Sequence, residues 1–305
     1  MTRIVCLGIA VLDRVYEVEA IPSDPVKVAA SDYRETGGGM AATAAVAVSA
    51  LGGTAEFWGR LGTDAVGDVV LEAMSRHGVD ISNVDRAPGS RSPTAAVLVE
   101  PGGERLLAVF TGRGLRDDVS WLPLNALAGA GAVLGDGRWT AGCLALFEAA
   151  RARGIPSVLD ADIVPRETLA PLVKVASATI FSERGLAAYA EAPDPSRGLA
   201  WVAQEADGIV GVTLGARGVL WREGKREQHV PAFPIVAHDT TGAGDVFHGA
   251  YALALAEGRG PQGAVRFASA AAALKCARGR GWDGMPDRAA VDEMLMEGPH
   301  AALGG

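Results

Sequence analysis

The sequence has few cysteines and no cluster of positive charge. Its only cysteines are Cys6, Cys143 and Cys276, an odd number without Cys-x-x-Cys spacing. This pattern argues against a disulfide framework and a structural metal, and favours small buried side chains in a reducing compartment. The 28 Lys and Arg residues are outnumbered by 36 Asp and Glu residues, so the net charge is −8. Nucleic acids and anionic membranes are therefore not expected partners, and any phosphate site must be local.

Long apolar runs are also missing. Residues 4–12 form an apolar stretch near the N-terminus, but Asp13 and Arg14 end it and no small-residue cleavage site follows. No other stretch reaches the roughly 18 to 20 charge-free residues that a membrane span needs. We therefore expect a cytoplasmic protein in which residues 4–12 form a buried first strand.

What the chain does contain is an alternation of short apolar runs and helix-length segments. Strands are predicted at 54–58, 132–135, 157–159, 179–181 and 208–212, and helices at segments such as 41–51 and 144–153. This order predicts an α/β fold with a mostly parallel sheet sandwiched by helices. Because 49% of the residues are hydrophobic and no linker divides the chain, we expect a single domain over 1–305.

Two segments depart from this alternation. Residues of about 14–36 and 92–111 have strand-like patterns without an intervening helix, and Pro101-Gly102-Gly103-Glu104 is a turn signal. We expect these segments to form a small separate sheet. Its open edge strands would invite pairing with a second chain.

Residues 239–249, Asp-Thr-Thr-Gly-Ala-Gly-Asp-Val-Phe-His-Gly, form the most informative stretch. A short strand is predicted at 234–239 and a helix at 246–257, so Gly242, Ala243 and Gly244 lie at a helix N-terminus. Unpaired N–H groups and the helix dipole attract anions there, and glycines permit close backbone approach. Asp245 would sit beside that anion site as a proton acceptor. The alternative is a capped helix that follows a glycine turn.

This stretch resembles the C-terminal signature of the ribokinase-like, or PfkB, family of carbohydrate kinases. Segments 11–13, 37–45, 59–67 and 212–218 also match family motifs in family order, so the resemblance covers essentially the whole chain. It implies a ribokinase-like fold in which the small sheet is a lid over the sugar site and often forms a homodimer interface. It also implies that Asp245 is the catalytic base and that Gly242, Ala243 and Gly244 form the anion hole.

The resemblance further implies which residues bind the sugar. Asp13 matches the family aspartate that accepts hydrogen bonds from sugar hydroxyls, although a strand-end cap is an alternative. Gly37, Gly38 and Gly39 match the first glycine signature, and an ordinary loop would have the same periodicity. Where ribokinases and most fructokinases carry an asparagine, residues 40–44 offer only the Thr43 hydroxyl. The pattern of hydroxyls that is recognised must therefore differ.

ATP and Mg²⁺ are the cofactors that the resemblance implies. Thr213, Gly215 and Gly218 would approach the nucleotide phosphates, while Ala272 and Cys276 lie on a predicted helix that leaves room for adenine. Helix packing is the alternative for that alanine-rich helix. Asp160 and Asp162 would orient magnesium-bound water or cap a helix, and Glu183 would substitute within the family's Asn-x-x-Glu motif, whose two ends are Ser182 and Gly185 in this sequence. Magnesium is expected because it neutralises phosphate charge in the transfer.

Several segments, among them 135–139, 158–162 and 267–276, resemble the bacterial sulfofructose kinases of this family most, and ketohexokinases next. The implied reaction phosphorylates the 1-hydroxyl of 6-deoxy-6-sulfofructose in sulfoquinovose catabolism. Its sulfonate would need cationic partners, for which Lys27 and Arg138 are the candidates. Val109 stands where a polar contact is expected, and Arg113 would replace it. The alternatives are a ketohexokinase-like or fructokinase-like kinase of another ketose, a nucleoside kinase, and a non-catalytic sensor.

Overall fold

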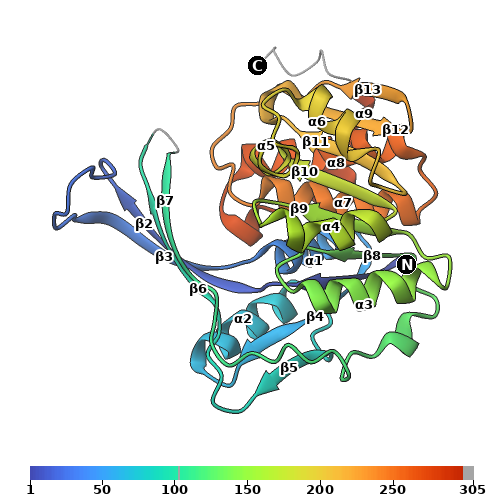
Figure 1. Ribbon diagram of the computed structural model, residues 1–305. Coiled ribbons are helices and arrows are strands. Elements are labelled where there is room, and N and C mark those ends of the chain that lie inside the picture. Colours follow the sequence, from blue (N-terminus) through green and yellow to red (C-terminus); the bar gives the residue numbers. More distant parts are fainter. Residues whose placement is uncertain (102–103, 298–305) are drawn as a thin grey trace.

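A nine-stranded sheet forms the centre of the protein (Figure 1). The computed structural model describes residues 1–101 and 104–297. The strand order across the sheet is β13-β12-β11-β10-β9-β8-β1-β4-β5. In chain order the strands are β1 (Arg3–Gly8), β4 (Thr54–Gly62), β5 (Val84–Ala87), β8 (Ala132–Gly135), β9 (Ser157–Ala161), β10 (Ala178–Ser182), β11 (Ile209–Thr213), β12 (Val219–Glu223) and β13 (Arg226–Val230).

Most of this sheet is parallel, as predicted. Every neighbouring pair from β11 to β5 is parallel, and only β12 and β13 pair in antiparallel register at one edge. The five strands predicted at 54–58, 132–135, 157–159, 179–181 and 208–212 are confirmed as β4 and β8 to β11. Because parallel strands end at the same edge, polar residues that follow β8, β9 and β10 lie at one edge of the sheet.

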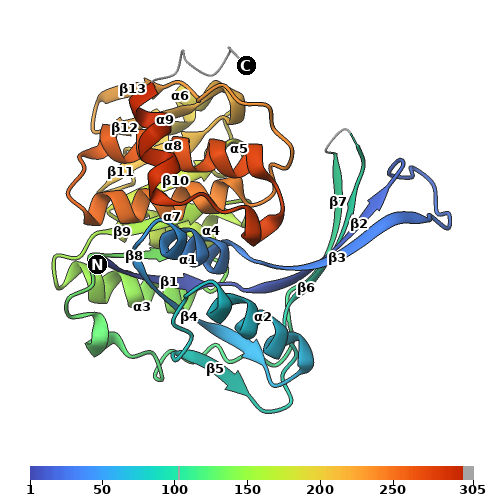
Figure 2. The same cartoon turned by 180° about the vertical axis from the view of Figure 1, so that it is seen from behind.

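Helices cover both faces of the sheet (Figures 1 and 2). One buried cluster packs α1, α2, α7, α8 and α9 against the sheet, and a second packs α3, α4, α5 and α6 against the other face. The helices are α1 (Met40–Ala50), α2 (Ala65–Arg76), α3 (Thr140–Arg151), α4 (Arg166–Val175), α5 (Glu183–Ala190), α6 (Pro195–Val202), α7 (Ala243–Ala256), α8 (Pro261–Arg278) and α9 (Arg288–Glu297), with short 3₁₀ turns η1 (Leu124–Leu127), η2 (Gly215–Arg217) and η3 (Gly281–Gly284). Among the helices of the described residues, none is long and apolar enough to cross a bilayer.

A second, four-stranded sheet projects from this body (Figure 1). We call it the lid, and it consists of β2 (Val11–Val18), β3 (Ala30–Gly38), β6 (Thr94–Val99) and β7 (Arg105–Phe110), in the order β3-β2-β6-β7. The β2–β3 and β6–β7 pairs are antiparallel, whereas β2 and β6 are parallel. The two strand-like segments predicted at about 14–36 and 92–111 therefore form one sheet. The turn expected at 101–104 includes Gly102 and Gly103, which lie outside the described residues.

Two strand predictions were wrong. The apolar run 4–12 is not one strand, because it leaves the body at Gly8 and enters the lid at Val11. The buried Asp136 carboxylate accepts the Ile9 N–H at 2.7 Å at this point, so the Ile9 amide does not continue the sheet. Segment 234–239 contains no strand, and Val236 within it is 76% exposed. The backbone N–H groups of His238 and Asp239 instead donate to the Cys276 carbonyl in α8.

Candidate active site

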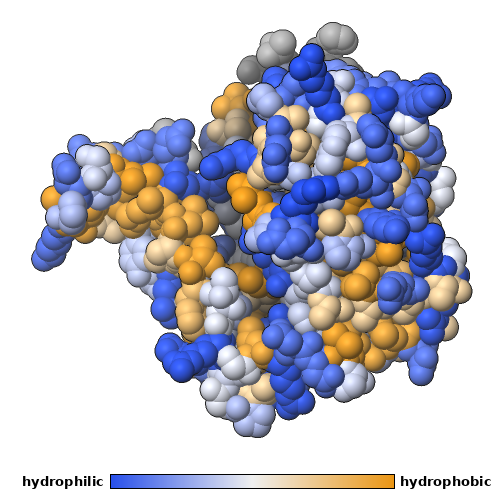
Figure 3. Space-filling view, in the orientation of Figure 1, coloured by the Kyte–Doolittle hydropathy of each residue, from blue (hydrophilic) through white to orange (hydrophobic). Residues whose placement is uncertain are grey.

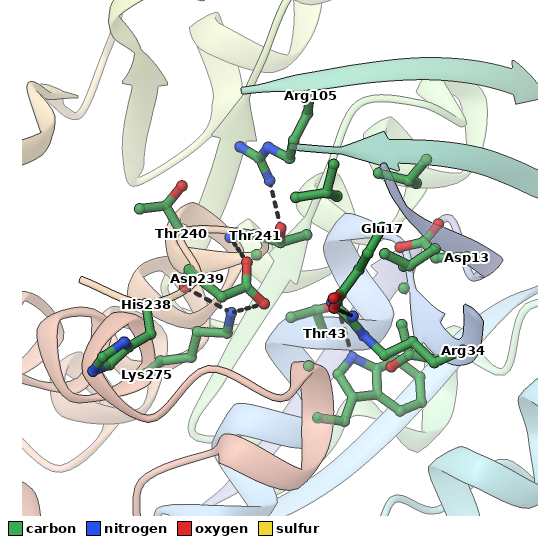
Figure 4. Close-up of a pocket in the computed structure, with 18 of the residues that line it drawn as sticks. Asp13, Glu17, Arg34, Thr43, Arg105, His238, Asp239, Thr240, Thr241 and Lys275 are labelled. Carbon is green, nitrogen blue, oxygen red and sulfur yellow. Dashed lines mark hydrogen bonds and ion pairs between the residues drawn. The ribbon is translucent and has the colours of Figure 1, made fainter. Parts of the chain in front are cut away.

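A cavity of about 530 Å³ lies where the lid meets the body. Its size is typical of small-ligand sites. The lining comes from lid strands, from the glycine run before α1, from the turn before α7 and from the end of α8, as Figure 4 shows. The lining residues that bear on function are Asp13, Glu17, Arg34, Gly37, Gly38, Gly39, Thr43, Glu100, Arg105, Asp239, Thr241, Gly242, Asp245, Lys275 and Trp282.

The turn before α7 presents backbone N–H groups to this cavity. Gly242 caps the helix with φ 72°, a left-handed conformation that favours glycine. Ala243 N–H donates weakly to the Thr240 carbonyl at 3.3 Å, whereas the N–H groups of Gly244 and Asp245 have no acceptor within 1–101 or 104–297. These donors and the dipole of a 14-residue helix form a site for an anion.

Asp245 stands in the first turn of α7 beside these donors. Burial raises the pKa of its carboxyl to about 7, and the nearby Asp160, Asp136 and Asp162 act in the same direction. The charge of His248 partly opposes this rise. A carboxyl group whose pKa lies near neutrality is well suited to accept a proton and release it again.

His248 anchors the helix turn that carries Asp245. Its buried ring has Nδ1 at 2.7 Å from the Gly244 carbonyl and 3.1 Å from Asp160 Oδ2, while Nε2 lies 3.0 Å from the Ile180 carbonyl in β10. The first turn of α7 is thereby held against the ends of β9 and β10. The sequence prediction did not include this role.

Asp13 lines the same cavity from lid strand β2. Burial raises the pKa of its carboxyl to about 6. The glycine run packs tightly around it, because a Cβ on Gly38 would lie 2.2 Å from Asp13 Oδ2. A Cβ on Gly37 would lie 2.1 Å from the Trp282 ring. The residues predicted to bind the sugar therefore lie together in the structure: Asp13, Gly37, Gly38 and Gly39.

Thr43 also lines the cavity, on the first turn of α1. Its Oγ1 accepts a hydrogen bond from Trp282 Nε1 at 3.0 Å. The hydroxyl hydrogen of Thr43 is then left to point elsewhere, so this side chain both fixes the tryptophan and can donate to a ligand. Trp282 itself was not predicted.

Three cations line the cavity, and none of them was predicted. Arg34 Nη1 pairs with Glu17 at 2.7 Å within the lid, and Lys275 Nζ lies 3.5 Å from Asp239 Oδ2 in the body. Arg105 reaches from β7 to the turn and donates to Thr241 Oγ1 at 2.6 Å. In the described part of the chain, no carboxylate lies within 4.0 Å of Arg105. Its guanidinium therefore forms no ion pair among the described residues.

The cations predicted for a sulfonate do not line this cavity. Lys27 is exposed in the loop between β2 and β3, and Arg113 is exposed after β7 with its backbone bridged to Arg91. Arg138 follows β8, at the predicted edge of the sheet, but its Nη2 donates to Asp162 at 3.0 Å. The sequence pattern located the strand end correctly and missed the carboxylate that takes up the charge. Val109 is 55% exposed on β7.

The residues predicted for magnesium each contact another residue of the protein. Asp160 faces His248, Asp162 accepts from Ser182 and Arg138, and Glu183 pairs with Arg217. Among the residues that the structure describes, no group of three His, Cys, Asp or Glu side chains could hold a metal ion. The protein thus offers no metal cage of its own there.

The residues predicted for the nucleotide lie outside the cavity lining. Thr213 ends β11, and Gly215 and Gly218 bound the turn that follows it, with Gly218 at φ 90°. Ala272 and Cys276 lie on α8, as expected, and the Cys276 carbonyl holds the backbone of residues 238 and 239. These assignments stay predictions.

Asp136 was missed by sequence reasoning although it follows β8 at the predicted edge. Its buried carboxylate accepts N–H groups from Ile9, Ala41 and Arg138, at 2.7, 3.3 and 3.0 Å. A Cβ on Gly8 would lie 2.1 Å from it. One carboxylate thus ties together the end of β1, the start of α1 and the loop after β8. The signal available was an aspartate directly after a buried strand.

Comparisons with known proteins agree with this geometry. Residues 1–288 match the family model for pfkB family carbohydrate kinases. The ribokinase of Bacillus subtilis is 28% identical, with 97% of this chain and 100% of that protein covered. A crystal structure from Agrobacterium tumefaciens, of a protein assigned provisionally as a ribokinase, is 35% identical with a TM-score of 0.92, covering 97% and 98% of the two chains. The structure of Arabidopsis thaliana ribokinase complexed with ribose and ATP is 26% identical with a TM-score of 0.84, covering 96% and 98%.

Proposed function

Because the chain belongs to the pfkB family of carbohydrate kinases, we propose that it transfers the γ-phosphoryl group of ATP to a hydroxyl group of a monosaccharide. Asp245 is the base, and the N–H groups of Gly244 and Asp245 bind the transferred group. Asp13 and the backbone of the glycine run 37–39 bind the acceptor.

One observation carries this proposal. Asp13 and Asp245 line the same cavity, and the turn before α7, whose Gly244 and Asp245 N–H groups have no acceptor among the described residues, lines it as well. A sugar bound by Asp13 in this cavity would therefore lie close to both the proposed base and the anion site. Positioning and charge stabilisation supply most of the catalysis in such transfers.

The reaction requires one proton to move. As the acceptor oxygen bonds to the γ-phosphorus, the bond from that phosphorus to the β,γ-bridging oxygen breaks and ADP leaves; the acceptor's proton passes to the Asp245 carboxylate, and the N–H groups at the turn stabilise charge on the equatorial oxygens. Mg²⁺ bound to the ATP phosphates would neutralise their charge. Asp162, which now accepts from Arg138, would be a candidate for contact with it through water.

A neutral monosaccharide such as ribose is the first candidate acceptor. The cavity is lined by the carboxylates of Asp13, Glu17, Glu100, Asp239 and Asp245 against the cations Arg34, Arg105 and Lys275. This balance favours a ligand rich in hydroxyl groups over one with a fixed negative charge. The complex of the Arabidopsis ribokinase with ribose and ATP supports the same choice.

A second candidate is 6-deoxy-6-sulfofructose. The observation that favours it is Arg105 of the lid, which lines the cavity and whose partner among the described residues is the neutral hydroxyl of Thr241. A guanidinium in this position suits a sulfonate. Lys27 and Arg138 would join it only if the lid and the loop after β8 moved inward.

The decisive experiment is a panel of acceptors. We would measure ADP release with ribose, fructose, 6-deoxy-6-sulfofructose and adenosine at saturating ATP and Mg²⁺, with an acceptor-free control. A preference for ribose by kcat/KM supports the first candidate, and a preference for sulfofructose supports the second. Turnover of adenosine alone would indicate a nucleoside kinase, and no turnover of any acceptor would refute the proposal.

We also propose that the protein forms a homodimer through the lid. Strand β7 is an edge strand exposed along its whole length, and it carries Leu106, Leu107, Val109 and Phe110 with exposures between 38% and 55%. Figure 3 shows apolar side chains gathered over the lid. An open edge with apolar side chains on both faces favours pairing with a second copy. Light scattering on the wild type and on Leu107→Glu tests this, since a monomeric wild type would contradict it.

A further inference from the structure

Lys275 is a buried cation that lines the cavity from the body of the protein. It lies in the last turn of α8, and its side chain is 1% exposed. Lysine is almost never fully buried unless it is paired, because an ammonium loses its hydration in the interior. The free energy needed to desolvate this ammonium indicates that Lys275 does more than pack the helix.

The contacts of Lys275 converge on the turn that precedes the anion site. Its Nζ donates to the Asp239 carbonyl at 3.2 Å and lies 3.5 Å from Asp239 Oδ2. Asp239 Oδ1 in turn accepts the N–H of Thr241 at 2.8 Å, and Thr241 directly precedes Gly242. Figure 4 shows this series of contacts from Lys275 through Asp239 to Thr241. The ammonium therefore fixes the backbone that leads into the helix cap.

The charge of Lys275 also faces the cavity. Lys275 and Asp245 line the same space, together with Asp239, Thr241 and Gly242. Arg34 and Arg105 line it as well, but they belong to the lid, whereas Lys275 belongs to the body. Lys275 thus supplies positive charge beside the anion site whatever the position of the lid.

We propose that Lys275 is a positioning residue for phosphoryl transfer: its ammonium is an internal cation that orders the 239–242 turn, so that the N–H groups after it stay directed at the phosphoryl group. This inference rests on the proposed kinase function. A purely structural alternative is that the pair with Asp239 only fastens α8 to the turn for folding. The two readings differ in whether a small cation in solution can replace the side chain.

The test compares two variants of the full-length protein. Lys275→Ala removes the ammonium and leaves a space bordered by the Asp239 oxygens, which ammonium or methylammonium ions can fill. Lys275→Met fills that space with an apolar chain. We expect kcat to fall about a hundredfold in both, the scale of a misplaced catalytic group. We expect the affinity for the ATP analogue AMP-PNP, measured by calorimetry, to fall about tenfold, the value of one charge-assisted hydrogen bond.

Rescue is the discriminating measurement. Ammonium or methylammonium chloride should restore kcat and AMP-PNP affinity tenfold or more in Lys275→Ala, and should change neither in Lys275→Met. Lys174→Met, the same substitution at an exposed lysine of α4, is the matched control and should behave as the wild type. Sodium chloride at equal ionic strength controls for screening.

Three results would overturn the proposal: wild-type kcat and AMP-PNP affinity in Lys275→Ala, losses that no added cation reverses, or full turnover in a Lys275→Met, Asp239→Asn double variant. The double variant removes both charges, so it also decides the question if Lys275→Ala fails to fold: a folded double variant with low turnover supports the positioning role. If the wild type phosphorylates no acceptor, the kinase proposal fails while AMP-PNP binding still tests Lys275.

Discussion

The contact between Gly38 and Asp13 makes a sharp prediction about acceptor binding. Gly38→Ala would place a Cβ 2.2 Å from Asp13 Oδ2 and 2.7 Å from its Cγ, so the carboxylate must rotate away. Gly38 does not occupy the left-handed region, so only the lack of space is at issue. The displaced carboxylate loses the hydroxyl groups that it would bind.

The size of the effect follows from the bonds that are lost. A hydrogen bond to a charged group contributes about 1.5 to 3 kcal/mol, which corresponds to about 10- to 150-fold in kcat/KM. We expect a loss in this range for the acceptor, with the KM for ATP within about twofold of the wild type, because the anion site belongs to the turn before α7, which a Cβ on Gly38 does not contact. Steady-state kinetics with each substrate varied in turn measure both values.

A matched control and a clear refutation are available. Gly263→Ala adds a Cβ whose nearest neighbour lies at 3.6 Å, an ordinary contact, and should leave the kinetics unchanged. An unchanged acceptor kcat/KM in a folded Gly38→Ala protein would show that Asp13 does not bind the sugar. Equal losses for acceptor and ATP would instead indicate general damage to the fold.

Three further predictions concern the chemistry. Asp245→Asn should lower kcat about two to four orders of magnitude while AMP-PNP binding by calorimetry is retained; near-normal turnover would remove Asp245 as the base. Since the pKa of Asp245 is raised to about 7, kcat/KM should rise as the pH increases through 7. The native state also binds this proton more tightly than the unfolded chain does, so the contribution of Asp245 to the free energy of unfolding falls as the pH rises through 7. pH-rate profiles measure the rise in kcat/KM, and denaturation midpoints measure the fall in stability. A flat rate profile from pH 5 to 8 would contradict the predicted rise. Arg138→Met should change kcat/KM for ribose and for sulfofructose by the same factor, because its partner is Asp162; a selective loss of about 2 to 5 kcal/mol for sulfofructose would restore Arg138 to the acceptor site.

The sequence predicted those features that depend on short-range patterns. Alternating apolar runs identified the parallel strands, and the residues 239–249 identified the helix cap with Asp245 beside it. The apolar run 4–12 misled because hydrophobicity continues while the chain changes sheet, and the cause of the change is a carboxylate at residue 136. Periodicity carries no information about a partner so far along the chain.

The charged residues show the same limit. Arg138 was located at the correct strand end, but its partner Asp162 follows a different strand. Lys275, Arg105 and Arg34 were not predicted, because each acquires its meaning from a contact made through the fold: Arg105 and Thr241, for example, are separated by 136 positions. A sequence motif identifies residues that act together within one short segment. Cations contributed by distant elements can be identified only from the three-dimensional structure.

The connection between β1 and β2 is short, and it links the position of Asp13 to the position of the lid. Only Ile9 and Ala10 separate a central strand of the body from the lid strand that carries Asp13, and the lid strand β3 ends in the glycine run that starts α1. Under the proposed roles of Asp13 and Asp245, a bend at these junctions would carry the sugar-binding carboxylate toward or away from the base on α7. Capture of the sugar and its approach to the phosphoryl donor would then be a single displacement. An acceptor too large to travel with Asp13 would be rejected at that step even where it fits the resting cavity.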